Sequence, residues 1–314
     1  MLAALTLLAL AVQPRALHDQ AAAGWSWPMT LNLGDAPNAA LRWVLAIPRP
    51  PDLPAEAEDG PLLALAPSRA APQPADQRMI DLRSYALESI RDGTALVPRL
   101  LLERLPTNLP RLETGELRKR LFIKALLPAL LAENERVTER RIRLVDLMTA
   151  AEAGHMRLDS EHSWLIDLAE SYGVEPDNLD ELLRRVDAVP PSLALAQAAL
   201  ESGWGTSRSA QQTHSLFGHM MFTSGEFGRA ALRPFETLAD AIAAYVHNLN
   251  THRAYAQFRE RRARQRMIGQ MPDGHELAGE LQRYSERGSD YIRDVRLLIR
   301  TNRLDPFDRA RLGL

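Results

Sequence analysis

The sequence predicts a mainly α-helical fold with one small pair of strands, and two observations support this prediction. Apolar residues recur at helical spacing in several stretches after residue 115, which is typical of helices that bury one face. Only two short runs, on either side of Gly225, have the form of strands around a turn. We therefore expect a helical domain with a small β-hairpin lobe, preceded by a helical segment and a proline-rich tether.

The N-terminal part shows no pattern of a packed domain. Residues 1–20 contain the apolar run MLAALTLLALAV, which suits a signal-peptide core and is short for a membrane span. No Lys or Arg precedes this run, so a mis-set start or a buried helix remains an alternative. Residues 21–78 are rich in Pro and Ala and have no helical or alternating period, which predicts an extended or disordered tether.

Residues 79–156 are predicted to form a helical segment. One helical face between residues 115 and 154 carries Leu117, Leu121, Phe122, Leu126, Leu127, Leu130 and Leu131. Pro128 interrupts this pattern, so we expect either two helices or one bent helix. The charged run 133–143 is most simply a solvated helix face with ion pairs between successive turns.

Residues 157–314 are predicted to form a second, lysozyme-like domain built mostly of helices. We expect helices over about 161–172 and 178–189, followed by a break at Pro190 and Pro191. A short buried helix begins there with Ser192 as its predicted N-cap.

The second half of this domain is also predicted to be helical. Thr237 and Asp240 form a capping-box start for a helix over 238–249. The arginine-rich stretch 259–266 is most simply a solvated helix face, with attraction of acidic wall peptides or polymers as the alternative. Two closing helices are separated by Gly288.

Glu201 falls in the last turn of the helix that begins after the two prolines. The C-terminal end of a helix carries partial negative charge, and apolar neighbours such as Leu200 and Trp204 withhold water. Both effects favour the protonated carboxyl, which is what a general acid for glycoside cleavage requires. Gly203 and Gly205 are suited to end the helix. The ordinary alternative is a solvated surface glutamate.

Composition and motifs argue against several other classes of protein. The formal net charge is −2, so no global basic field indicates nucleic-acid binding. The chain has no cysteine, which excludes disulfides, thiolate metal sites and a cysteine nucleophile. The histidine pairs lack a completing set of metal ligands, and we expect no cofactor. The residues around Ser202 and Gly203 lack the pattern of a phosphate-binding loop or a nucleophile elbow.

Three ordered motifs carry a resemblance to a known family. They are AQAALESGWGTSRSA around Glu201, HSLFG at 214–218, and FETLADAIAAYVHNLNTHRAYAQFR at 235–259. Together they resemble the glucosaminidase domain of family 73 glycoside hydrolases, and most closely its Bax-type bacterial members. The segment RKRLFIKALLPALLAENERV at 118–137 resembles the N-terminal helical region of those members. Ser215 departs from the family's N-L-F-G pattern, where we expect Asn.

The resemblance implies an activity and a first catalytic residue. It implies an α+β lysozyme-like fold that hydrolyses the β-1,4 bond after N-acetylglucosamine in peptidoglycan, with Glu201 as the acid. Glu226, at the predicted hairpin tip, is the first candidate for a second carboxylate, and Glu236 and Asp240 are weaker ones. The substrate's own acetamide is the alternative to a second carboxylate.

Aromatic residues complete the predicted site. Tyr245 is expected to hydrogen-bond near the reacting sugar, with a core tyrosine as the alternative. Trp204, Phe217 and Tyr255 are expected to contact substrate in the groove.

Two rival functions and a location complete the expectations. A lytic transglycosylase would use the same helix and acid, and a wall-binding protein without activity would keep only the fold. The expected partner is the glycan strand of peptidoglycan, with no nucleic acid and no membrane span. The expected location is the periplasm or cell envelope. The oligomeric state is not predicted.

Overall fold

The computed structural model describes residues 82, 85–112, 115–153, 158–222 and 230–313. These residues belong to one of the two units into which the chain divides, the unit made of residues 32–47 and 62–314. The predicted signal peptide and tether lie outside the described residues, as does Glu226.

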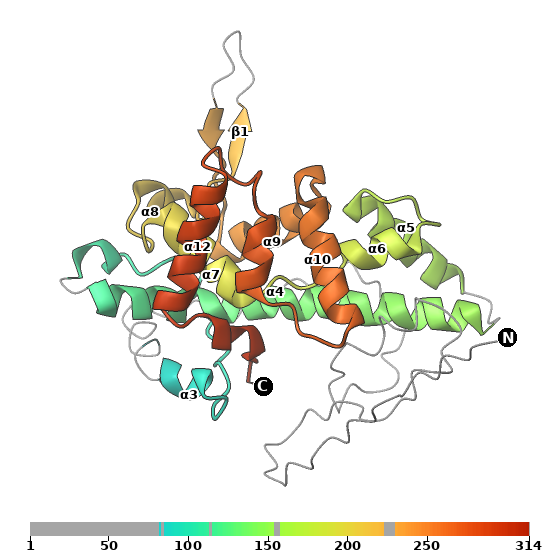
Figure 1. Ribbon diagram of the computed structural model, residues 1–314, viewed down its shortest axis with the longest axis horizontal. Helices are drawn as coiled ribbons and strands as arrows, with labels where there is room; N and C mark the ends of the chain where they lie inside the picture. Colours follow the sequence, from blue (N-terminus) through green and yellow to red (C-terminus); the bar gives the residue numbers. More distant parts are fainter. Residues whose placement is uncertain (1–81, 83–84, 113–114, 154–157, 223–229, 314) are drawn as a thin grey trace, which may run out of the picture. The chain divides into compact units, whose positions relative to one another are not determined.

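Helices dominate the described part of the chain, as predicted (Figure 1). The α-helices are α3 Leu87–Arg91, α4 Gly115–Glu152, α5 Asp159–Tyr172, α6 Leu179–Arg185, α7 Pro191–Ser202, α8 Arg208–Thr213, α9 Leu238–Thr251, α10 Ala256–Met267, α11 Gly274–Leu277 and α12 Ser289–Thr301. Short 3₁₀ helices are η2 Leu109–Arg111, η3 Arg253–Tyr255, η4 Ala278–Glu280 and η5 Asp305–Arg309. Strands β1 Met220–Phe222 and β2 Ala230–Leu232 pair antiparallel, with Met221 opposite Ala231.

Helix α4 runs without interruption through Pro128, so the alternative of two separate helices is wrong. A proline removes one N–H from the helix and normally costs about 3 kcal/mol in a helix interior. Pro128 is buried together with Leu127 and Leu130, and α4 packs along α7 and α9. Packing of this apolar face therefore outweighs the local cost of the proline.

Helix α7 lies at the centre of the core and is apolar on nearly every side. Its residues from Pro191 to Ala199 are all buried, and it contacts α4, α11, α12 and η5. Such a helix, enclosed by others on all sides, is typical of the interior of a protein. One hydrophobic core extends from Leu82 to Leu312, so the predicted helical segment and the predicted second domain share it.

The helix caps agree with the sequence at one place and differ at another. Thr237 with Asp240 forms the capping box of α9, as predicted, and Asn178, the first residue of the helix expected over 178–189, is the N-cap of α6. The prediction for Ser192 is wrong, because Pro190 is the N-cap of α7. The backbone N–H of Ser192 and its hydroxyl instead donate to Asp308 in η5, at 2.7 and 2.8 Å.

The arginine-rich stretch in α10 is not a solvated face, which corrects the prediction for residues 259–266. Arg262 and Arg266 are buried and converge on the carboxylate of Asp187, with N–O distances of 3.5 and 2.7 Å. Arg141 of α4 lies 3.9 Å from the same carboxylate, so the charged run 133–143 is also partly buried. We call these four residues the Asp187 cluster.

The Asp187 cluster also satisfies the carboxyl end of α6. Arg141 donates to the carbonyl oxygens of Leu183 and Val186, and Arg262 donates to that of Arg184 at 3.0 Å. The last carbonyl groups of a helix have no partner within the helix and carry partial negative charge. The cluster therefore ties α4 and α10 to the end of α6, just before α7 begins.

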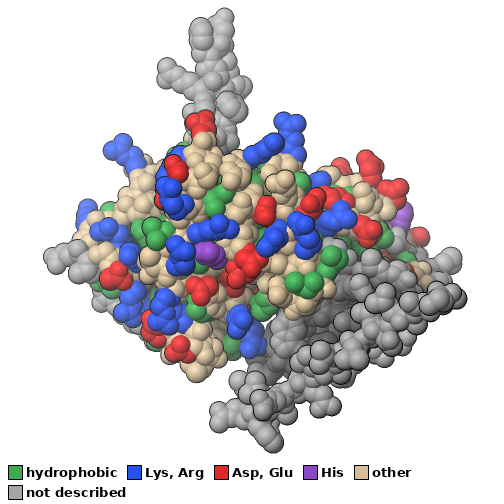
Figure 2. All heavy atoms as spheres, viewed as in Figure 1, with side chains coloured by type: hydrophobic (Ala, Val, Ile, Leu, Met, Phe, Trp, Pro, Cys, Tyr) green, Lys and Arg blue, Asp and Glu red, His purple; other side chains and the backbone are tan. Residues whose placement is uncertain are grey.

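The surface carries charges of both signs. On the face shown in Figure 2, Lys and Arg side chains lie among Asp and Glu side chains. In the part of the chain that the structure describes, no helix combines the length and the apolar character that a bilayer crossing requires.

Candidate active site

Glu201 lies in the last turn of α7, as predicted, and the helix ends just beyond it. Gly203 takes the left-handed conformation with a φ of 58°, and its N–H bonds to the carbonyl of Ala199. A left-handed glycine after the last helical residue is a common way to end a helix. The carboxylate of Glu201 therefore lies at the C-terminal end of the buried helix α7, where the chain turns.

Two residues from distant parts of the chain contact the Glu201 carboxylate. A Cβ added to Gly218 would lie 2.9 Å from Oε2 of Glu201, so the glycine backbone covers one side of the carboxylate. Tyr291, on α12, lies near enough to Glu201 for its hydroxyl to lower the pKa of the carboxyl. Helix α12 packs directly on α7 (Figure 1), which explains how a residue so far along the sequence reaches this carboxylate.

The pKa of Glu201 is raised above its ordinary value. Burial is the largest cause, and the hydrogen bond from Tyr291 and the charge of Arg287 partly oppose it. The residue as a whole is nevertheless exposed. The raised pKa and the exposure of the residue are compatible, because Gly218 and Tyr291 cover two sides of the carboxylate and its other sides remain open to solvent. This is the state that the sequence predicts for a general acid.

Two hydrogen bonds connect Tyr291, beside this carboxylate, to α9. Tyr245 donates to Oε1 of Gln197 at 2.7 Å, and Nε2 of Gln197 donates to the hydroxyl of Tyr291 at 2.9 Å. Gln197 is fully buried one turn before Glu201. Neither Gln197 nor Tyr291 was predicted from the sequence as a site residue. A single polar side chain in the apolar run PSLALAQAAL was the available signal for Gln197.

The structure brings Tyr245 and Phe217 close to Glu201 but buries both of them. The two rings stack with centroids 4.0 Å apart, and they are 0% and 2% exposed. Tyr255 is also buried, and its ring lies 6.0 Å from that of Tyr284.

Trp204 is only partly buried and packs toward α4. Its ring meets the edge of Phe122 at 5.7 Å, and the ammonium group of Lys119 lies 5.6 Å from its centre. It therefore keeps part of its surface free, unlike Phe217 and Tyr245.

The weaker candidates for a second carboxylate have other surroundings. Oδ2 of Asp240 accepts hydrogen bonds from the N–H and the hydroxyl of Thr237, so Asp240 serves the capping box. Glu236 is exposed and lines a hollow of about 410 Å³ with Asp240 and Arg233. Among the described residues there is no group of three or more His, Cys, Asp or Glu side chains that suits a metal ion.

Residues 177–304 match the model of the glucosaminidase family, described as mannosyl-glycoprotein endo-beta-N-acetylglucosaminidase. Protein bax of Escherichia coli (strain K12) is 31% identical over 195 residues, which cover 59% of this chain and 69% of that protein. The chain belongs to the Bax-type glucosaminidases. No solved structure matches it significantly.

Membership of this family confirms the resemblance and makes the protein a glycoside hydrolase-type enzyme with a glycan substrate. The matched residues of this glucosaminidase include Glu201, Gly218 and Tyr291. Glu201 and the two residues beside its carboxylate therefore all lie in the matched region.

Replacing Gly218 with Ala is expected to inactivate this glucosaminidase. The new Cβ would need the space of Oε2 of Glu201, so the carboxylate must move. A misplacement of about 1 Å costs roughly 10²-fold in rate. The measurement is glycan turnover beside thermal unfolding.

Gly269→Ala is the matched control for this prediction. Gly269 has a similar positive φ of 73°, but an added Cβ there meets no atom within 4 Å. Both variants carry the backbone strain of about 1 kcal/mol, and only Gly218→Ala should lose activity. Equal turnover by the two variants would show that contact with Gly218 does not position Glu201.

Proposed function

We propose that this protein is a peptidoglycan hydrolase that cleaves the β-1,4 bond after N-acetylglucosamine, with Glu201 as general acid. The observation that carries the proposal is the raised pKa of Glu201, at the end of a buried helix within the family's matched region. We further propose that the helices around α7 form a lysozyme-like domain, and that β1 and β2 belong to its small β-lobe.

The surroundings of Glu201 favour holding the proton before the reaction and also releasing it during the reaction. Burial raises the pKa of Glu201 and so favours the protonated carboxyl before the reaction. As that proton passes to the glycosidic oxygen, the bond from this oxygen to the anomeric carbon breaks and water completes hydrolysis. Tyr291 and Arg287 both favour the carboxylate that is left behind. The site thus holds an acid that is able to release its proton.

The second group of the reaction is either Glu226 or the acetamide of the substrate. Family 73 resemblance favours a carboxylate from the hairpin, whereas substrate assistance needs none. Tyr245 acts in this proposal as a positioning residue, because its hydroxyl reaches Glu201 only through Gln197 and Tyr291.

The aromatic side chains have different parts in the proposed groove. Phe217 and Tyr255 are buried, so in this proposal they pack behind the wall of the groove and do not face the sugar. Trp204 is the aromatic residue that keeps exposed surface for a sugar ring. The substrate and the apolar run at the N-terminus together favour the periplasm or cell envelope as the location.

Digestion of purified peptidoglycan, followed by mass spectrometry of the products, tests the proposed function. Hydrolysis after N-acetylglucosamine gives fragments with reducing N-acetylglucosamine ends. Anhydromuramic ends would identify a lytic transglycosylase instead. Binding of peptidoglycan without any soluble product would identify a wall-binding protein without activity.

Replacing Tyr291 with Phe is expected to shift the pH dependence of hydrolysis. The hydrogen bond from Tyr291 lowers the pKa of Glu201, so its loss raises that pKa further. Activity of a general acid falls as pH rises through its pKa, and the alkaline limb of kcat/KM should therefore move to higher pH. The rate at the optimum should fall about twofold to tenfold, as for loss of one hydrogen bond.

Tyr284→Phe is the control for this prediction. Its hydroxyl donates to the carbonyl oxygen of Phe217 at 2.8 Å, on the same aromatic cluster. Because the Tyr284 hydroxyl bonds to a backbone carbonyl and not to Glu201, Tyr284→Phe should leave the alkaline limb in place. An unmoved limb in Tyr291→Phe would contradict the proposed role.

A further inference from the structure

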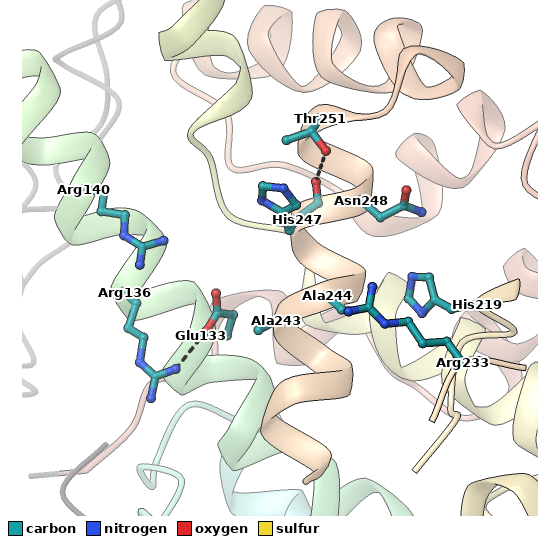
Figure 3. A pocket seen from close by; sticks show the side chains of 10 residues that line it. All are labelled: Glu133, Arg136, Arg140, His219, Arg233, Ala243, Ala244, His247, Asn248 and Thr251. Carbon is teal, nitrogen blue, oxygen red and sulfur yellow. Dashed lines mark hydrogen bonds and ion pairs between the residues drawn. The ribbon is translucent and has the colours of Figure 1, made fainter. Parts of the chain in front are cut away.

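A second hollow, formed between α4, α9 and the start of the strands (Figure 3), is lined by basic side chains. It has a volume of about 670 Å³. Figure 3 shows Arg136 and Arg140 of α4 on one side, His219 and Arg233 on the other, and α9 between them. Ala243 and Ala244 of α9 leave room on its floor. We call this hollow the basic cleft.

Positive charge exceeds negative charge in the basic cleft. Glu133 is the acidic residue that lines it, and it is paired with Arg136 at 3.1 Å. Arg140 and Arg233 therefore supply charge beyond that of the pair. The guanidinium of Arg233 lies 5.2 Å from the ring of Phe235, and the described residues include no ion-pair partner for it.

His219 adds two unused hydrogen-bonding groups. Neither ring nitrogen of His219 has a hydrogen-bond partner among the described residues, although both are buried. Burial and the charge of Arg233 lower the pKa of His219 to about 4, so its ring is neutral near neutral pH. A buried polar group without a partner is costly, and a bound ligand would remove that cost.

The basic cleft begins one residue after Gly218, which covers the Glu201 carboxylate. Gly218 contacts the Glu201 carboxylate, and the next residue, His219, lines the cleft. Consecutive Cα atoms are about 3.8 Å apart. A ligand in the cleft therefore lies beside a glycan bound at Glu201, within reach of a substituent on that glycan.

We propose that the basic cleft binds free carboxylates of the peptides attached to the glycan strand. This inference rests on the proposed function, because it names a second part of the same substrate. Arginine forms strong paired hydrogen bonds with carboxylates, and Arg140 and Arg233 approach the cleft from opposite sides. An open cleft with a floor of small residues suits an extended peptide more than a single small ion.

Binding of soluble wall peptides to the full-length protein tests the inference. The probe is a wall tetrapeptide with free carboxylates, and the comparison peptide has the same carboxylates converted to amides. We expect the free-carboxylate peptide to bind about tenfold more tightly in calorimetry at low salt. Arg233→Gln should remove most of this preference, and Arg233→Lys should restore part of it. Arg233 is exposed, so neither change disturbs the core.

Arg264→Gln is the matched control, because Arg264 is an exposed arginine on α10 that does not line the cleft. It should bind the peptide as the wild type does. Equal binding of the free and amidated peptides would overturn the inference, as would an equal loss in Arg233→Gln and Arg264→Gln. Tighter binding of a glycerol phosphate polymer than of the peptide would also overturn it.

Cleavage of two substrates separates this inference from the proposed function. Glycan strands stripped of peptides should be cut equally by the wild type and Arg233→Gln, whereas intact peptidoglycan should be cut more slowly by the variant. Equal rates on both substrates would refute the peptide site and leave the hydrolase proposal intact. Absence of cleavage of either substrate would refute the hydrolase proposal, while the calorimetric result would still decide the peptide site.

Discussion

Replacing Glu201 with Gln is expected to abolish glycan turnover and leave the fold unchanged. The amide has nearly the same size as the carboxyl but cannot donate the proton that the leaving oxygen requires. General acid catalysis contributes about 10²- to 10⁴-fold, so turnover should fall by at least that range. Because the residue as a whole is exposed and the amide oxygen can still face Tyr291, the free energy of unfolding should change by less than about 0.5 kcal/mol.

The matched control for this prediction is Glu170→Gln. Glu170 is an exposed glutamate near the end of α5, and turnover by its variant should equal that of the wild type. Product release from labelled peptidoglycan gives the rate, and sedimentation with insoluble peptidoglycan gives binding. If Glu201→Gln retains more than about a tenth of the wild-type rate, Glu201 is not the general acid.

Replacing Asp187 with Asn is expected to be the most destabilising single change outside the apolar core. Asp187 is 2% exposed and faces three arginines, and the Asn side chain would leave their charges buried without a counter-ion. Removing one partner of a buried ion pair typically costs about 3–5 kcal/mol. Urea denaturation followed by circular dichroism measures the change.

The loss of stability in Asp187→Asn is expected to depend on pH, and the pKa of Asp187 decides in which direction. Burial raises the pKa of Asp187, but Arg141, Arg266 and Arg262 together outweigh burial, so the pKa is lowered below its ordinary value. A carboxylate with a lowered pKa stabilises the fold above its ordinary pKa, and this contribution is lost as the pH falls through the folded value. The stability gap between wild type and Asp187→Asn should therefore be full near neutral pH and narrow in acid.

Asp167→Asn is the control for the Asp187 prediction. Asp167 is exposed on α5, and its replacement should change the free energy of unfolding by no more than about 0.5 kcal/mol. A loss of less than about 1 kcal/mol in Asp187→Asn would mean that the cluster is already compensated by its hydrogen bonds to backbone carbonyls.

Local sequence determined the parts of the site that depend on a single helix and its ends. Two prolines, a run of small apolar residues and Gly203 are enough to predict a buried helix that ends just after Glu201. The motifs around Glu201 and after Phe235 were enough to identify the family. The capping box at Thr237 was predictable for the same reason, since a cap involves residues only three apart.

Only the tertiary structure decided which charged and polar residues are buried together. Arginines at 141, 262 and 266 look like solvated helix faces in sequence, yet they meet at Asp187 because α4, α6 and α10 pack around it. In the same way, Tyr291 reaches Glu201 because α12 lies on α7, and Gln197 links it to Tyr245. Patterns along the chain report which face of a helix is apolar, whereas the partner of a polar group depends on which distant helix packs against it.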